Sequence, residues 1–103
     1  MQELYKRVEQ LLEEELAKDN EKFPMFHSWY EAYAVIKEEI EECEDDLETI
    51  KQCNASTWEF IKRDDAKING YKAMQKQALL LACDAVRVAS MCKKSYNSEV
   101  NYK

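Results

Sequence analysis

Acidic side chains at helical spacing give this sequence its clearest capacity for chemistry. Residues 38–42 read E-E-I-E-E. At about 100° per residue, Glu39 and Glu42 project from one edge of the apolar stripe of a helix. Asp84 has the same position on a later helix, within the most apolar stretch of the chain. Because Mg²⁺ prefers oxygen ligands, the sequence predicts a Mg²⁺ site formed by Glu39, Glu42 and Asp84.

A solvated charged surface is the alternative interpretation of these residues. Glutamate is common on exposed helices, and Asp84 can pair with Arg87 one turn along the same helix. Burial of a lone carboxylate is costly, however, unless a cation or hydrogen-bond donors meet it. The sequence leaves both interpretations open for Glu39, Glu42 and Asp84. It favours the solvated interpretation for Asp46, which lies at the same helix edge.

Helices are expected to position these side chains. The chain of 103 residues has one Gly and one Pro, so it lacks the turn residues that sheets need. Apolar residues recur every three or four positions over three segments, as on the buried face of a helix. The sequence therefore predicts helices over residues 2–18, 28–52 and 71–95.

Local signals mark where these helices begin and end. The pattern S-x-x-E, typical of a capping box, occurs at Ser28 and again at Ser56. Ser28 predicts the start of the second helix, and Ser56 predicts a short helix after a break at residues 54–57. The Asn-Gly pair at residues 69–70 predicts the next break, and residues 96–103 are expected to fray.

The predicted helices indicate an all-α fold in which residues 1–103 form one helical domain. The two long helices are joined by a short helical excursion, so we expect them to form an antiparallel hairpin. A chain this short buries only a modest core. We therefore expect it to complete a four-helix bundle by oligomerisation, as a homodimer or homotetramer.

Charge is distributed unevenly along the chain. Residues 1–54 contain 6 basic and 16 acidic residues, a net charge of −10, whereas residues 55–103 contain 9 and 5, a net charge of +4. The acidic half argues against a nucleic-acid groove. The basic half can meet phosphates, although a surface complementary to the acidic half is favoured.

Cysteine usage indicates a reducing compartment. The four cysteines contain no C-x-x-C pair and the chain has one His, so a zinc site is not expected. Neither a signal peptide nor a membrane-spanning stretch is evident, so we expect no membrane partner. These features predict reduced thiols in the cytoplasm, with Cys43 and Cys92 as small core residues.

The carboxylate motifs resemble those of the MazG-like all-helical nucleoside triphosphate pyrophosphohydrolases, over about residues 26–95. That family carries E-E-x-x-E on one helix and E-x-x-D on a later, facing helix. Residues 38–42 match the first motif and Asp84 matches the aspartate of the second. The resemblance implies Mg²⁺ bound by these carboxylates and hydrolysis of a nucleoside triphosphate with release of pyrophosphate. It extends to small proteins of phages and prophages.

One position departs from the family pattern. Leu81 stands where the second motif has Glu, so one of four metal ligands is missing. Since a two-metal mechanism shares charge across several carboxylates, the resemblance supports the fold more than the activity. Arg87 and Lys76 are candidates for phosphate binding, and Trp58 is a candidate for stacking on a nucleobase.

Three functions are compatible with these residues. The first is Mg²⁺-dependent hydrolysis of a nucleoside triphosphate. The second is a nucleotide-binding protein without catalysis, which in a phage sequesters a nucleotide signal of host defence; Leu81 favours this one over the first. The third is an interaction protein whose acidic helix, over residues 31–48, covers a basic surface of a protein partner.

Overall fold

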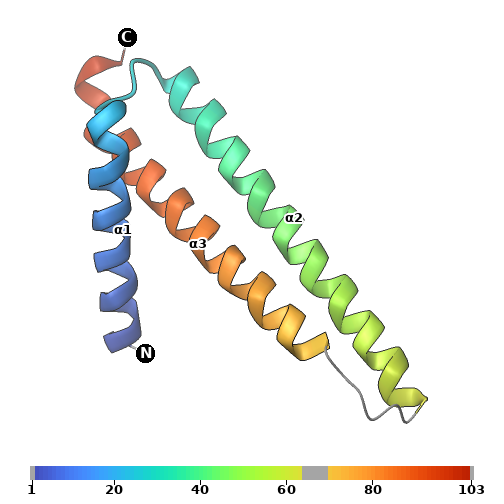
Figure 1. Ribbon diagram of the computed structural model, residues 1–103. Coiled ribbons are helices and arrows are strands. Elements are labelled where there is room, and N and C mark those ends of the chain that lie inside the picture. The colour runs from blue at the N-terminus through green and yellow to red at the C-terminus, as the bar shows by residue number, and fades with distance from the viewer. Residues whose placement is uncertain (1, 64–69, 103) are drawn as a thin grey trace.

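The computed structural model describes residues 2–63 and 70–102, and every regular element in these ranges is helical. The elements are α1 (Gln2–Lys22), α2 (Trp29–Lys62), α3 (Gly70–Asn97) and the short 3-10 helix η1 (Glu99–Asn101). α2 and α3 form a long antiparallel hairpin, and α1 packs against α3 (Figure 1). The predicted all-α fold is confirmed. Within the described ranges, the structure has no helix long and apolar enough to cross a bilayer.

The start of α2 follows the prediction, but its length does not. Ser28 caps the helix, because its Oγ accepts a hydrogen bond from the backbone N–H of Glu31 at 3.0 Å. The predicted break at residues 54–57 is wrong, since α2 continues through it as one helix to Lys62. Thr57 fits inside the helix because its hydroxyl donates to the carbonyl of Cys53 at 2.8 Å.

The other boundaries also extend further than predicted. α1 continues past Lys18 to Lys22, because Asn20 lowers helix propensity only slightly. α3 begins at Gly70, while Asn69 lies outside the described residues. A Cβ atom at Gly70 would overlap the Oγ1 of Thr57, so the two long helices approach closely where α3 begins.

The C-terminal segment packs instead of fraying. Ser98 is fully buried, and its Oγ accepts from the backbone N–H of Phe26 at 2.9 Å and donates to the carbonyl of Lys94 at 2.7 Å. The ring of Tyr102 lies against that of Trp29, with 4.0 Å between the centroids. The expectation of a frayed tail is therefore wrong through residue 102. Hydrogen bonds to the segment that connects α1 and α2 hold the tail in place.

The cysteines are free thiols, as expected, but their positions differ from the prediction. Cys43 is half-buried on α2, and Cys92 is exposed on α3. Cys92 was expected in the core because it shares the apolar stripe of its helix. The stripe is exposed there because no other described element covers that side of α3.

A buried lysine joins α3 to α1 and to the connector at the end of the hairpin where α2 begins and α3 ends. Lys94 on α3 is only 2% exposed. Its ammonium group pairs with the carboxylate of Asp19 near the end of α1 and donates to the carbonyl of Phe23 at 2.6 Å. It also lies over the ring of Phe26, 5.4 Å from the centroid. Lys94 thus links α3 to α1 and to the following connector.

Lys94→Ala should destabilise the protein by about 2–4 kcal/mol, because it leaves a carboxylate and a carbonyl oxygen without their shared donor. Urea unfolding followed by circular dichroism measures this loss. Lys93→Ala is the matched control, because Lys93 directly precedes Lys94 and pairs with Glu13 at the surface. Equal losses for the two variants would show that burial gives Lys94 no special role.

Candidate metal site and adjoining cavity

Three carboxylates meet where α2 and α3 pack together. One oxygen atom from each of Glu39, Glu42 and Asp84 lies within 4.8 Å of the other two. Glu39 and Glu42 are one turn apart on α2, and the antiparallel course of α3 brings Asp84 opposite them. The structure thus places together the three residues that the sequence singled out.

Glu39 is the buried member of this cluster. It is 8% exposed, and its Oε1 accepts from Nη2 of Arg87 at 3.0 Å. Its Oε2 is buried and has no hydrogen-bond partner in the part of the chain that the structure describes. Burial raises the pKa of Glu39, Arg87 opposes this rise, and the nearby Glu42 and Asp84 add to it. A buried carboxylate oxygen without a hydrogen-bond donor is energetically unfavourable. The Oε2 of Glu39 is therefore a candidate ligand for a cation.

Asp46 joins the cluster, although the sequence favoured a solvated position for it. Its Oδ2 is buried and has no hydrogen-bond partner among the described residues. The neighbouring carboxyl group of Asp84, together with burial and the charge of Glu42, raises the pKa of Asp46 to about 6. The helix-edge position of Asp46, the same as that of Glu39, was the signal that could have identified it.

The cluster offers hard oxygen ligands and no thiolate. Burial raises the pKa of the Cys43 thiol, and the carboxylates of Asp84 and Asp46 raise it further. Cys43 therefore stays protonated at neutral pH, and a protonated thiol is a poor metal ligand. The residues present fit a hard cation such as Mg²⁺.

The other predicted site residues lie at different distances from the cluster. Arg87 belongs to it through Glu39, and its guanidinium is half-exposed, with further N–H donors for an anion. Lys76 lies eight residues before Asp84 on α3, about 12 Å along the axis. Trp58 lies nineteen residues after Glu39, about 28 Å along α2. A nucleotide held at the carboxylates would not reach Trp58.

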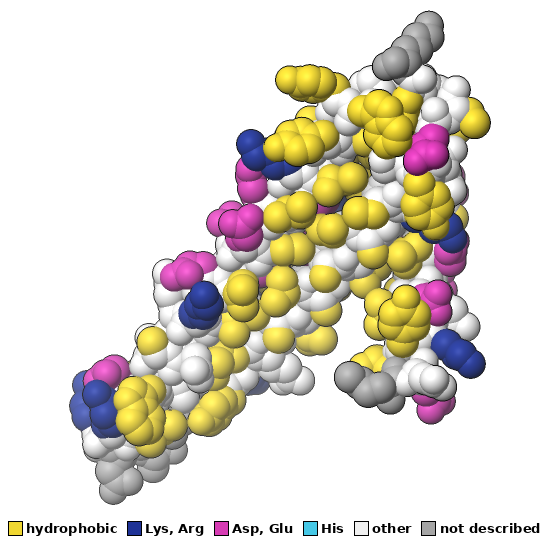
Figure 2. All heavy atoms as spheres, turned by 180° about the vertical axis from the view of Figure 1, so that it is seen from behind, with side chains coloured by type: hydrophobic (Ala, Val, Ile, Leu, Met, Phe, Trp, Pro, Cys, Tyr) yellow, Lys and Arg dark blue, Asp and Glu magenta, His cyan; other side chains and the backbone are white. Residues whose placement is uncertain are grey.

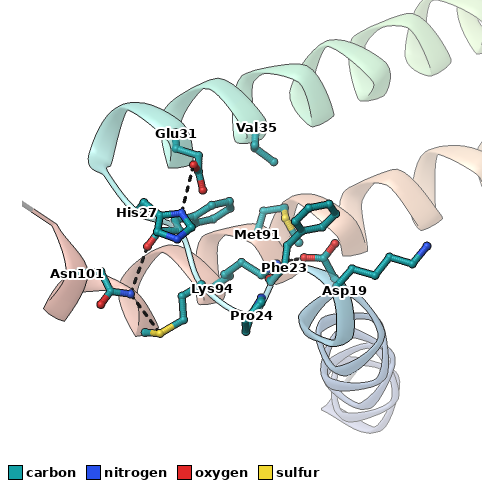
Figure 3. Close-up of a pocket in the computed structure, with 12 residues that line it drawn as sticks. Asp19, Phe23, Pro24, His27, Glu31, Val35, Met91, Lys94 and Asn101 are labelled. Carbon is teal, nitrogen blue, oxygen red and sulfur yellow. Dashed lines mark hydrogen bonds and ion pairs between the residues drawn. The ribbon is translucent and has the colours of Figure 1, made fainter.

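A cavity of about 1050 Å³ lies at the end of the hairpin where α2 begins and α3 ends, and none of the cluster residues lines it. Val35 on its wall is one turn before Glu39, and Met91 is one turn after Arg87, so cavity and cluster are neighbours along the helix pair. Figure 3 shows phenyl and thioether groups around it, with His27 pairing with Glu31 at the edge. The cavity is lined by Asp19, Lys22, Phe23, Pro24, Met25, Phe26, His27, Glu31, Val35, Met91, Lys94 and Asn101.

Little in the sequence indicates this cavity. Residues 23–26 read F-P-M-F, an apolar segment between two helices that by itself shows no pocket. The cavity forms because the connector, α3 and η1 meet there: the amide of Asn101 donates to Met25 Sδ at 3.2 Å and to the carbonyl of Phe26 at 3.5 Å. These contacts join residues about 75 positions apart, which no local pattern reports.

Leu81 lies in an apolar groove between α2 and α3. The lining of this groove is Ile40, Cys43, Glu44, Leu47, Leu81, Ala85 and Val88. The position at which the resembling family has a second glutamate is therefore an apolar packing position here.

Comparisons with known proteins identify no family. No protein-family model, no curated protein and no solved structure matches the chain. The case for a function therefore depends on the geometry described above and on the motif resemblance.

The raised pKa of Asp46 predicts an unusual pH response in EDTA. A raised carboxyl pKa means that the folded state binds the proton more tightly than the unfolded chain. The stability contributed by Asp46 is thus fully present below its ordinary value of 3.8 and is lost as the pH rises through about 6. Asp46→Asn should therefore raise the melting temperature relative to the parent at pH 7.5 but not at pH 4.

The control is Asp45→Asn, which removes one negative charge from the next position of α2, where the residue is exposed. Thermal melts of all three proteins between pH 4 and pH 7.5 separate relief of the cluster from general relief of an acidic helix. If both variants gain the same stability at pH 7.5, the neighbouring carboxylates do not raise the pKa of Asp46.

Proposed function

We propose that the protein binds Mg²⁺ through Glu39, Glu42 and Asp84 and uses the ion to hold the phosphates of a nucleotide. The observation that carries the proposal is the buried Oε2 of Glu39, which has no donor and lies beside two other carboxylates. Within residues 2–63 and 70–102, Arg87 is the one basic residue that pairs with this group. A divalent cation would offset the remaining negative charge and occupy the position that lacks a donor.

The surroundings of the cluster support a phosphate ligand. Mg²⁺ usually keeps part of its coordination shell for water and substrate phosphates. Arg87 is half-exposed and has donors left for a phosphate oxygen. The adjoining cavity of about 1050 Å³ is within the size range of small-molecule sites and has room for the base and sugar. Val35 and Met91 on its wall are one turn from Glu39 and Arg87, which suits a ligand that spans both regions.

Hydrolysis of a nucleoside triphosphate is the reaction that the motif resemblance implies. A bound Mg²⁺ would polarise the phosphate oxygens and lower the pKa of a coordinated water. The residues of this chain would hold the ion and orient the phosphates, with Asp46 available to accept a proton at its carboxylate.

Nucleotide binding without turnover is the second candidate, and Leu81 favours it. That side chain lines the apolar groove, so the chain has one carboxylate fewer than the family pattern. Capture of a nucleotide signal needs only affinity, which three carboxylates and Arg87 can supply through one ion. The two candidates share the site and differ only in whether pyrophosphate is released.

Mg²⁺ and Mn²⁺ should raise the melting temperature of the parent. At an ion concentration 100 times Kd, the expected gain is about 2.7 kcal/mol in the free energy of unfolding. Asp84→Asn should lose at least tenfold in ion affinity. Glu41→Gln is the control, because Glu41 is exposed and pairs with Lys37 at 3.9 Å on α2 itself. A parent that melts at the same temperature in EDTA and in metal would refute the proposal.

A nucleotide panel then separates the two candidate functions. With Mg²⁺ present, a nucleoside triphosphate should add a further thermal shift that Arg87→Ala reduces. Pyrophosphate release in the same samples identifies the enzyme, and a shift without release identifies the binding protein. A metal-dependent shift with no response to any nucleotide would keep the ion site and overturn the choice of ligand.

A further inference from the structure

The buried side of α2 is not its apolar side. Ala32, Glu39 and Thr57 are the buried residues of this helix, and the 7- and 18-residue spacings between them place all three at nearly one helical angle. Ile40 and Leu47 lie about 80–100° from that angle and are 42% and 45% exposed. A carboxylate and a hydroxyl are thus buried against α3 while aliphatic side chains beside them meet solvent.

These exposed side chains form a continuous apolar face. Between α2 and α3 it is hollowed by a groove of about 330 Å³, with Ile40 and Leu47 on one wall and Leu81, Ala85 and Val88 on the other. Figure 2 shows hydrophobic side chains gathered in a strip along the two long helices, with acidic and basic side chains at its edges. We name this strip the hairpin face.

The molecule exposes more surface than a compact monomer does. Its accessible surface is 8150 Å², whereas a compact monomer of this size exposes about 6,100 Å². Its radius of gyration is 17.8 Å, against about 13 Å for a compact domain. The hairpin face is about 40 Å long and about 20 Å wide, from the length of α3 and the width of two packed helices. That is about 800 Å², the area that each partner contributes to a standard stable interface.

The charges on the two helices indicate which surface fits on this face. α2 carries ten acidic and three basic residues, a net charge of −7, and α3 carries one acidic and five basic residues, a net charge of +4. A second hairpin turned about an axis parallel to the helices would lay its α3 on α2 and its α2 on α3. An axis across the helices would instead bring the two acidic helices together, which repulsion disfavours.

We propose that the hairpin face binds a second copy of this chain, with α2 of each copy against α3 of the other. The two hairpins then form a four-helix bundle whose interior contains the exposed aliphatic side chains. Glu44, which lines the groove on α2, lies at the edge where the partner's basic helix arrives. The carboxylate cluster plays no part in this contact, so the dimer does not depend on metal.

Sedimentation equilibrium on the full chain in EDTA tests the face. The parent should be a dimer at tens of micromolar, and Leu47→Glu should raise the dimer dissociation constant at least about 100-fold, because each dimer would bury two new carboxylates. Leu79→Glu is the matched control: Leu79 is 61% exposed on α3 and does not line the groove. A parent that stays monomeric at every concentration overturns the proposal, and so does an equal effect of the two substitutions.

Cysteine alkylation provides a readout that needs no variant. Cys92 and Cys83 are both exposed in a single chain, but Cys92 lies seven residues after Ala85 on the hairpin face, whereas Cys83 faces α1. Mass spectrometry after a brief maleimide pulse should show Cys92 protected as the dimer forms and Cys83 unchanged. Equal reactivity of the two thiols in a dimeric sample would assign the contact to another face and overturn the proposal.

Charge reversal at Glu44 tests the pairing of the helices. If α2 faces the partner's basic α3, Glu44→Lys should weaken the dimer about threefold at low salt. If α2 faced a second acidic α2, the same change would tighten it. Glu41→Lys is the control for net charge, since Glu41 does not line the groove. A tighter dimer with Glu44→Lys overturns the proposed pairing.

Discussion

The ion pair between Glu39 and Arg87 decides how the long hairpin is assembled. A buried carboxylate is tolerated only when a partner offsets its charge, so α2 and α3 must align where Arg87 reaches Glu39. That alignment sets Asp84 opposite Glu42 and Asp46. It also leaves Ile40 and Leu47 of α2 in the exposed groove between the two helices. The acidic cluster and the exposed hairpin face are therefore two consequences of one buried charge.

Polar contacts also close the end of the hairpin that borders the cavity. The ammonium group of Lys94 and the hydroxyl of Ser98 join α3 to α1 and to the connector. Such groups hold their neighbours in defined directions, because a misplaced partner leaves a buried polar atom unsatisfied. The cavity beside them consequently has a defined shape, and Val35 and Met91 on its wall lie one helical turn from Glu39 and Arg87. A ligand with an anionic end and a flat apolar end suits this arrangement.

Stability and function place opposite demands on the carboxylates. Without a cation the cluster holds several negative groups close together, and their repulsion contributes to the raised pKa of Asp46. A divalent cation would relieve it more fully, so ion binding and folding should be coupled. The hairpin face separately lowers stability, because its apolar side chains are exposed to water until a second hairpin covers them. The charge repulsion in the cluster and the exposed apolar surface lie on different surfaces, so a cation and a second copy can relieve them independently.

Sequence periodicity was sufficient to predict an all-α fold, the cap at Ser28 and the meeting of Glu39, Glu42 and Asp84, because each follows from spacing along one helix or from a simple antiparallel hairpin. It failed at residues 54–57, where tertiary packing of Thr57 against α3 outweighs weak helix propensity. Only the tertiary structure decided the rest. The packing of α2 against α3 buries the Oδ2 of Asp46 and exposes Ile40 and Leu47, and contacts between residues about 75 positions apart form the cavity. Spacing along a chain fixes which residues share a helix face, but the partner of that face depends on which buried charges must pair.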